Sequence, residues 1–201
     1  GDTTTVRKVA YKNGELKAIA QGKFDGYLKD SFCIDEYEGN LRVVTTKGDD
    51  NSVYVLDKNL EVIGSIEGLA EDEQVYSARF MGDTGYFVTF RQMDPLFSVD
   101  LSDPKNPKIL GALKIPGFSE YLHFYGEDRL LGIGMDVDEK AQSTDGIKLT
   151  MFDISNKADV KEADTYVLEN VYSTDVSYDY KAALVDQERN LIGFAGYTQG
   201  G

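Results

Sequence analysis

Four short apolar segments separated by turn residues fill the stretch Val75–Leu113. The turns contain Gly, Asp, Asn and Pro, as in Gly82–Gly85 and Ser102–Pro107. Short strand-forming runs bounded by such residues are typical of antiparallel strands that hairpin into one another. The stretch therefore predicts a four-stranded meander, and its recurrence along the chain constrains the fold more than any other feature.

The meander recurs in register along the chain. A tyrosine opens the first strand of three units: Tyr76, Tyr121 and Tyr172. An aspartate ends the third strand of three units: Asp57, Asp100 and Asp153. Glycines occupy matching places in two fourth strands: Gly64 and Gly111. A period of about 40–50 residues with four strands per period is the mark of a β-propeller blade, and such sheets are stable only when they stack on their neighbours.

We therefore predict an all-β fold, a β-propeller of four-stranded antiparallel blades with about four blade equivalents in one domain or domain fragment. Over residues 1–201 the pattern gives a half-blade at 5–27, blades at 28–68, 75–115 and 121–169, and a half-blade at 172–198. The half-blades either close a four-bladed ring, with Val6–Ala20 and Tyr172–Ala195 in one sheet, or belong to a segment of a larger propeller. A β-sandwich also has short, evenly spaced strands, but the repeat register argues against it. Two helix-like stretches, Gly68–Gln74 and Ala182–Asn190, are expected to decorate loops.

The charge of the chain limits its partners. It carries 35 acidic and 21 basic residues, a net charge of −14. An acidic excess of this size repels phosphate backbones and anionic lipid surfaces, so we expect no nucleic-acid partner. No apolar run approaches the roughly 20 residues of a membrane helix, so direct membrane insertion of this segment is not expected. The single cysteine, Cys33, allows neither an internal disulfide nor a Cys-based metal site.

The single histidine is a candidate binding residue. His123 is too isolated for a His-rich metal site, and the common nucleophile, phosphate-loop and zinc motifs are absent from the sequence. Two residues after the strand-opening position lie Cys33, Ala78, His123 and Thr174. First strands line the channel of a propeller, so these residues either face a small polar channel or pack between blades. No carboxylate can be assigned to His123 as a partner, so it is not expected to act as a catalytic base.

A second candidate lies in the link between two strands of the central unit. Arg91 and Asp94 stand three residues apart around a turn that Pro95 stiffens. They either present a charged pair to a ligand at the propeller rim or form a structural ion pair that caps strand ends. Surface ion pairs contribute only about 0–1 kcal/mol, so stability alone does not require this pair.

An acidic insertion at Asp136–Gly146 is the third candidate. Asp136, Asp138 and Asp145 offer the hard oxygen ligands that calcium prefers. However, Lys140 stands where an EF-type loop requires an oxygen donor, and Ala141 stands where it requires glycine. The insertion is therefore either a solvated surface loop or a weak calcium site. No other cofactor is expected.

Two segments of the central unit, Val75–Gly82 and Val88–Phe97, resemble a bacterial and archaeal family of secreted proteins with a C-terminal β-propeller distantly related to WD40 repeats. The likeness continues in Asp35–Tyr37, Asp100–Pro104, Lys114–Ser119, Leu122–His123 and Asn190–Phe194. The resemblance implies a propeller, an extracytoplasmic location (secreted or cell-surface) and a parent chain with further blades. It implies no catalytic residues.

The sequence as a whole favours a non-enzymatic binding or scaffolding module. A repeated frame without a recognisable catalytic set places its functional surfaces on loops, where a protein, a glycan or another domain of the parent chain binds. The alternative is a hydrolase or lyase that acts on cell-surface polysaccharide through paired channel carboxylates. Such an enzyme predicts a pocket with converging ionisable groups of shifted pKa, whereas a binding module predicts a shallow loop face.

Overall fold

The chain folds almost entirely into antiparallel β-strands. A computed structural model describes residues 2–71, 73–90, 94–115, 118–138, 140, 143–169, 173–174 and 183–197, without the side chains at 76, 90, 94, 115, 118, 143–145, 173–174 and 196–197. The described residues form strands β1 to β18 and one short 3₁₀ turn, η1 (Ser31–Cys33). The predicted all-β fold class is confirmed.

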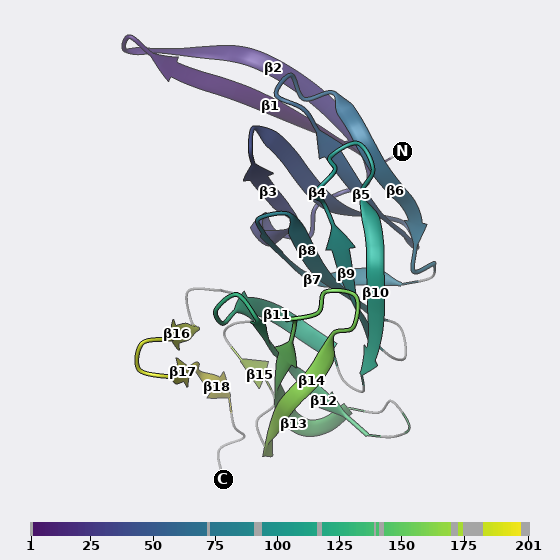
Figure 1. Cartoon of the computed structure of the whole chain (residues 1–201), viewed down its shortest axis with the longest axis vertical. Helices are drawn as coiled ribbons and strands as arrows, with labels where there is room; N and C mark the ends of the chain where they lie inside the picture. Colours follow the sequence, from purple (N-terminus) through teal and green to yellow (C-terminus); the bar gives the residue numbers. More distant parts are fainter. Residues whose placement is uncertain are drawn as a thin grey trace. The chain divides into compact units, whose positions relative to one another are not determined.

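Three four-stranded sheets make up most of the chain (Figure 1). In the first sheet the order is β3 (Ile34–Tyr37), β4 (Asn40–Lys47), β5 (Asp50–Leu56) and β6 (Val62–Leu69). The second holds β7 (Gln74–Met81), β8 (Thr84–Phe90), β9 (Asp94–Asp100) and β10 (Lys108–Ile115). The third holds β11 (Phe118–Phe124), β12 (Arg129–Val137), β13 (Ser143–Asp153) and β14 (Lys161–Glu169). Strands that are neighbours in sequence are neighbours in each sheet, which is the meander of a propeller blade.

Shorter sheets occupy the two ends of the chain. β1 (Thr3–Lys12) pairs with β2 (Glu15–Asp25). β15 (Ser173–Thr174) pairs with β18 (Gly196–Tyr197), and β16 (Leu184–Asp186) pairs with β17 (Leu191–Gly193). Among the described residues these terminal strands stand in separate sheets, and they do not form the joint sheet that a four-bladed ring requires. The two stretches with a helix-like pattern contain strand and turn where they are described.

The turns follow from the residues that occupy them. The Asn13-Gly14 pair joins β1 to β2, and both residues have positive φ (54° and 77°). Glu38-Gly39 joins β3 to β4 in the same way, with φ of 51° and 83°. Two-residue hairpin loops need positive φ at both positions because their twist then matches that of the strands. The Asn-Gly hairpin signal in the sequence is therefore realised.

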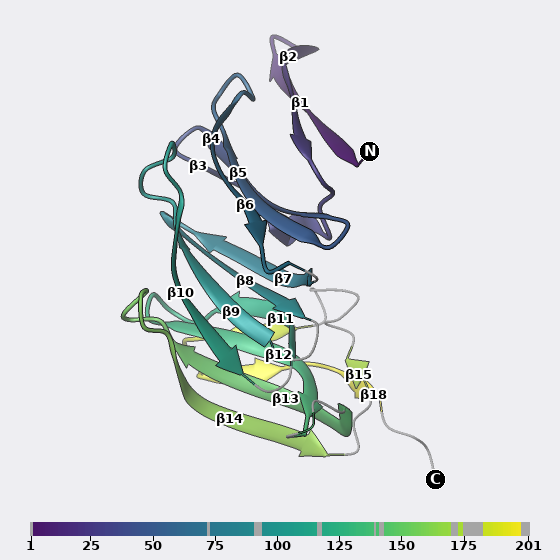
Figure 2. The ribbon, with the colours of Figure 1, turned by 90° about the vertical axis from the view of Figure 1, so that its right-hand side faces the viewer.

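The chain forms two compact units. The first comprises Gly1–Val75, Phe80–Gly85 and Val99–Ile109, and the second comprises Tyr76–Arg79, Tyr86–Ser98 and Leu110–Gly201. The core of the first unit contains Phe24, Val43, Tyr54, Leu56 and Leu60. Within it the Phe24 and Tyr54 rings stack with centroids 6.1 Å apart. This contact fixes the β1–β2 hairpin beside the β3–β6 sheet (Figure 2).

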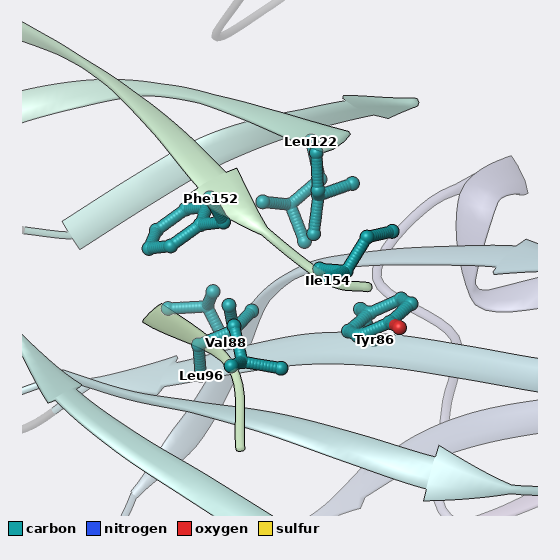
Figure 3. Packing of buried hydrophobic residues seen from close by; sticks show 8 residues of the cluster. Tyr86, Val88, Leu96, Leu122, Phe152 and Ile154 are labelled. Carbon is teal, nitrogen blue, oxygen red and sulfur yellow. The ribbon is translucent and has the colours of Figure 1, made fainter. Parts of the chain in front are cut away.

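The core of the second unit joins strands of two sheets. Its buried members are Tyr86, Val88, Leu96, Leu122, Leu130, Phe152, Ile154 and Val160. Figure 3 shows Leu122 and Phe152 pointing toward Val88 and Leu96. Full burial of each such side chain stabilises the fold by about 1.5–3 kcal/mol, so this cluster holds β8 and β9 against β11 to β13.

A glycine in three successive outer strands allows close approach of the next sheet. Gly22 in β2 lies against the backbone carbonyl oxygen of Leu60, and Gly64 in β6 lies against the backbone carbonyl oxygen of Pro104. A Cβ atom on Gly111 in β10 would lie 2.9 Å from the carbonyl oxygen of Ala158, and on the other two glycines the distance would be shorter. In each case the oxygen belongs to the connection between the third and fourth strands of the following sheet. The matched glycines of the sequence repeat are therefore required by packing between sheets.

Candidate functional site

The predicted Arg91–Asp94 pair cannot be placed. Arg91 lies outside the described residues. Asp94 is the first residue of β9, and its side chain lies outside the description. A role for this pair at the rim stays a prediction.

The acidic insertion is partly strand. Asp136 belongs to β12, and Asp138 follows the end of that strand. The exposed Asp138 carboxylate accepts the Lys140 backbone N–H at 2.8 Å. Asp145 belongs to β13, and its side chain lies outside the description. Among the described residues no group of three or more His, Cys, Asp or Glu side chains is arranged to hold a metal ion, and the calcium site stays a prediction.

Cys33 is fully buried at the end of η1. Burial raises the pKa of its thiol to about 12, and the nearby Asp30 charge adds to this effect. The thiolate is the nucleophilic form of cysteine, so Cys33 is held in its unreactive form at neutral pH.

The strand registers correct the predicted equivalence of Cys33 and His123. In the first sheet, Asp35 of β3 pairs with Arg42 of β4, and Arg42 pairs with Val55 of β5. Val55 stands two residues before Asp57, the aspartate at the end of the third strand. His123 lies opposite Leu131, which lies opposite Met151, again two residues before the corresponding aspartate. Asp35, not Cys33, therefore shares the position of His123. The prediction was wrong by two residues because the β3–β4 turn has two residues and the β11–β12 connection has four.

Arg42 is a buried cation at a position that is apolar in the third sheet, where Leu131 stands. Its Nε and Nη2 atoms donate to the Asp35 Oδ2 atom, at 3.1 and 2.5 Å. The guanidinium lies 4.9 Å from the Tyr37 ring centre and 5.5 Å from that of Phe80. The Asp35 carboxylate and the two aromatic rings compensate the Arg42 charge, so we assign Arg42 a structural role. Arg42 also lines a small cavity of about 160 Å³.

Three side chains from two sheets meet at the single histidine. His123 and Tyr121 stand two residues apart on β11, and Arg79 comes from β7. The Nδ1 atom of His123 lies 2.8 Å from the Tyr121 hydroxyl and 3.0 Å from Nη2 of Arg79. The Arg79 guanidinium carbon lies 5.6 Å from the Tyr121 ring centre. Sequence reasoning found His123 but missed Arg79 and Tyr121, which we name with it the imidazole cluster.

The hydrogen bonds of the imidazole cluster determine the tautomer of His123. A guanidinium only donates hydrogen bonds, so Nδ1 accepts and carries no proton. Burial lowers the pKa of His123, and the Arg79 charge lowers it further. Burial also raises the pKa of Tyr121, against the opposing effect of Arg79, so the hydroxyl keeps its proton and is a second donor. At neutral pH the ring is therefore a neutral imidazole with its proton on Nε2.

A hollow of about 470 Å³ lies beside the imidazole cluster. We call it the His123 hollow. His123 and Phe124 line one wall, and 184–188 from β16 and the following turn line the other. The hydroxyl of Tyr125 donates to Oδ1 of Asn190 at 2.7 Å, which holds the β16–β17 hairpin beside the end of β11 (Figure 1).

Charged side chains of the β16–β17 turn are partly paired with each other. Asp186 accepts the Arg189 backbone N–H at 3.1 Å and the Arg189 Nη1 atom at 2.8 Å. Glu188 lies between them in sequence and also lines the hollow. The arrangement offers a mixed polar and apolar surface for binding.

Comparisons with known proteins identify related chains. A family model for the beta propeller domain matches residues 1–200. An uncharacterized protein of Methanocaldococcus jannaschii is 42% identical over 202 residues, which cover 97% of this chain and 31% of that protein. An uncharacterized protein of Archaeoglobus fulgidus is 45% identical over 179 residues, which cover 89% of this chain and 28% of that protein. The chain thus spans about a third of the length of these curated relatives. In the described part of the chain no helix is long and apolar enough to cross a membrane.

Proposed function

This chain belongs to the beta propeller domain family, and we propose that it is a non-catalytic binding module that recognises its ligand at the His123 hollow. The observation that carries the proposal is the hydrogen bonding of His123, whose Nδ1 atom is approached by two donors. Propeller frames host many activities, so the function must be argued from the site and not from the fold.

The imidazole cluster is suited to recognition and poorly suited to proton abstraction. A general base needs a free nitrogen that gains a proton near the working pH. In His123 the accepting nitrogen is engaged by Arg79 and Tyr121, and the lowered pKa opposes protonation. With Nδ1 engaged, the second ring nitrogen carries the proton, and a hydrogen-bond donor held in one tautomer on a residue that lines the hollow suits binding.

The enzymatic alternative is a polysaccharide hydrolase or lyase with two carboxylates at a fixed separation. Asp186 and Glu188 both line the His123 hollow. Asp186 already accepts two hydrogen bonds from Arg189, which favours a structural role for that carboxylate. We therefore prefer binding to catalysis.

The setting of the module is part of the same proposal. We place the chain outside the cytoplasm and expect its partner to be a protein, a glycan or another domain of the parent chain. The likeness to secreted propeller proteins supports the location, and the strong acidic excess argues against nucleic acid and anionic lipid as partners.

A hydrolysis screen tests the proposal. The purified chain is incubated with a panel of polysaccharides and peptides, beside the variants His123→Gln and Asp186→Asn. Asp159→Asn, at an exposed position of the same compact unit, is the matched control. We expect no turnover by any of these proteins. Turnover that is lost in His123→Gln and kept in Asp159→Asn would show that the module is an enzyme.

A further inference from the structure

The N-terminal hairpin has the contacts of an outer strand pair. Gly22 in β2 lies against the connection that follows β5, as Gly64 in β6 lies against the connection that follows β9. β2 therefore corresponds to a fourth strand, and β1 corresponds to the third strands β5, β9 and β13. Each of those third strands has a neighbour on both sides, whereas β1 pairs with β2 alone among the described residues. One side of β1 is thus an open sheet edge.

The backbone of β1 presents hydrogen-bonding groups at this open edge. The Gly26 N–H donates to the Asp2 carbonyl oxygen at 2.7 Å, which fixes the alternation of the β1–β2 ladder. Hydrogen-bonded and non-hydrogen-bonded pairs alternate in such a ladder, so the N–H groups of Thr5 and Arg7 point away from β2, and that of Lys8 points toward it. A row of outward N–H and C=O groups is a template for another strand.

A groove of about 180 Å³ lies beside β1. Val6, Arg7 and Lys8 of β1 form one wall, and the other wall includes Leu41 and Leu60 of the first sheet. The lining residues come from β1 and not from β2, so the groove belongs to the side of the hairpin that lacks a strand. Val6 and Leu41 already pack against the core that contains Leu60. An apolar side chain that enters the groove would extend this core.

The tip of the hairpin exposes apolar side chains. Val6 packs toward the core, and alternate residues of a strand point to opposite faces, so Val9 and Tyr11 lie on the face turned away from it. Val9 is 55% exposed, Tyr11 is 73% exposed, and Leu16, which pairs with Tyr11, is 76% exposed. A ten-residue edge strand with exposed apolar side chains is an aggregation hazard unless another segment pairs with it.

The charges of β1 select among the strands that could pair with it. β1 carries Arg7, Lys8 and Lys12 and no acidic side chain, in a chain of net charge −14. A second copy that paired its own β1 with this edge would bring these cations together, and like charges on paired strands are destabilising. A strand with acidic side chains pairs favourably. This chain covers 31% and 28% of its two curated relatives, so related proteins contain further segments that can supply such a strand.

We propose that the open edge of β1 binds a hairpin of the parent chain from outside residues 1–201. The nearer strand of that hairpin runs antiparallel to β1, takes the position that β4 has beside β5, and carries acidic side chains toward the basic ones of β1. Its apolar side chains enter the groove at Leu41 and Leu60. The proposal concerns the first compact unit and is independent of binding at the His123 hollow.

Hydrogen exchange of the full parent chain tests the proposal, with residues 1–201 alone as the reference. In the reference, the N–H groups of Thr5 and Arg7 should exchange quickly and that of Lys8 slowly, because only the Lys8 N–H points toward β2. In the parent chain, Thr5 and Arg7 should exchange on the order of a hundredfold more slowly than in the reference. Equal exchange in the two proteins would overturn the proposal.

A zero-length carbodiimide cross-link identifies the segment that pairs with β1. The reagent joins a lysine amine to a carboxylate that touches it, and a mixture of nitrogen-15-labelled and unlabelled parent chain separates links within a chain from links between copies. We expect Lys8 or Lys12 to be linked to a carboxylate of the same chain outside residues 1–201. Links between copies, or links from these lysines only to carboxylates within residues 1–201, would rule out the proposed hairpin.

Two proline variants provide a matched pair. Arg7→Pro and Lys8→Pro each remove one positive charge and one N–H group. In residues 1–201 alone, Lys8→Pro should lower Tm by at least about 4 °C more than Arg7→Pro, because proline is tolerated where the N–H of an edge strand faces solvent. In the parent chain the two variants should lower Tm by similar amounts. If Arg7→Pro stays the milder variant there, no strand pairs with β1.

Discussion

Replacement of Gly64 by alanine should weaken the attachment of one sheet to the next. The new Cβ atom would meet the backbone carbonyl oxygen of Pro104 well inside the 3.0 Å limit of real Cβ contacts. It would also lie 3.0 Å from the carbonyl carbon of Lys105 and 3.0 Å from Cδ of Pro107. Backbone atoms and a proline ring cannot rotate away, so the whole β9–β10 connection must retreat from β6.

The size of the effect follows from two opposing terms. Overpacking of a close contact costs about 1–3 kcal/mol, and a backbone obstacle places this site near the upper value. Loss of glycine from the unfolded chain offsets about 0.4–1 kcal/mol. The expected net loss is about 2 kcal/mol, which lowers Tm by about 4–8 °C in a chain of this size.

Scanning calorimetry of a glycine series provides the assay. Gly193→Ala in β17 is the matched control, because its nearest neighbour is Cβ of Leu184 at 3.7 Å, an ordinary contact. Gly111→Ala, with the Ala158 oxygen at 2.9 Å, should fall between the two. If Gly64→Ala melts within about 1 °C of Gly193→Ala, the close approach of the sheets at this glycine is refuted.

Three further predictions concern the charged and titratable side chains. Asp35→Ala should lower the free energy of unfolding by about 2 kcal/mol in urea denaturation, less than the loss of a partner from a fully buried ion pair because Asp35 is partly exposed. The double variant Asp35→Ala with Arg42→Leu should recover most of this loss. A single variant as stable as the unchanged chain contradicts the structural role of Arg42. Cys33, with its pKa raised to about 12, should resist thiol reagents at pH 8 and react fully in denaturant, and rapid labelling of the native chain would argue against its burial. The pKa of His123 is lowered in the folded chain from its ordinary value of 6.5, so the unfolded chain binds this proton more readily. The contribution of neutral His123 to stability is therefore present above about pH 6.5 and declines as pH falls through the lowered folded pKa. Between about pH 7.5 and 5.5, a His123→Asn variant should lose less stability than the unchanged chain. Equal losses would contradict this assignment.

The fold was predictable because its markers are local. Asp57 directly follows β5, and Asp100 and Asp153 are the last residues of β9 and β13. Each carboxylate accepts a backbone N–H two residues later at 2.9 Å. An aspartate that stabilises the start of a turn in this way recurs wherever the turn recurs. The matching glycines of the outer strands are equally visible in the sequence, although what requires them is the close approach of the next sheet.

The candidate site was less predictable because it depends on pairs of distant residues. Arg79 and His123 are 44 positions apart, and no spacing rule joins them. The strand position of His123 also depends on the length of the β11–β12 connection, so counting from the strand start matched it with Cys33. The β16–β17 wall of the His123 hollow lies in a stretch whose pattern is helix-like, so the sequence does not point to Asp186 and Gln187 as lining residues.

Nuclear magnetic resonance of the single histidine tests the central claim most directly. In a chain labelled with nitrogen-15 in histidine, both ring nitrogens belong to His123. We predict a neutral ring protonated at Nε2 at pH 7. A ring protonated at Nδ1 or a charged imidazolium would contradict a recognition site built on His123.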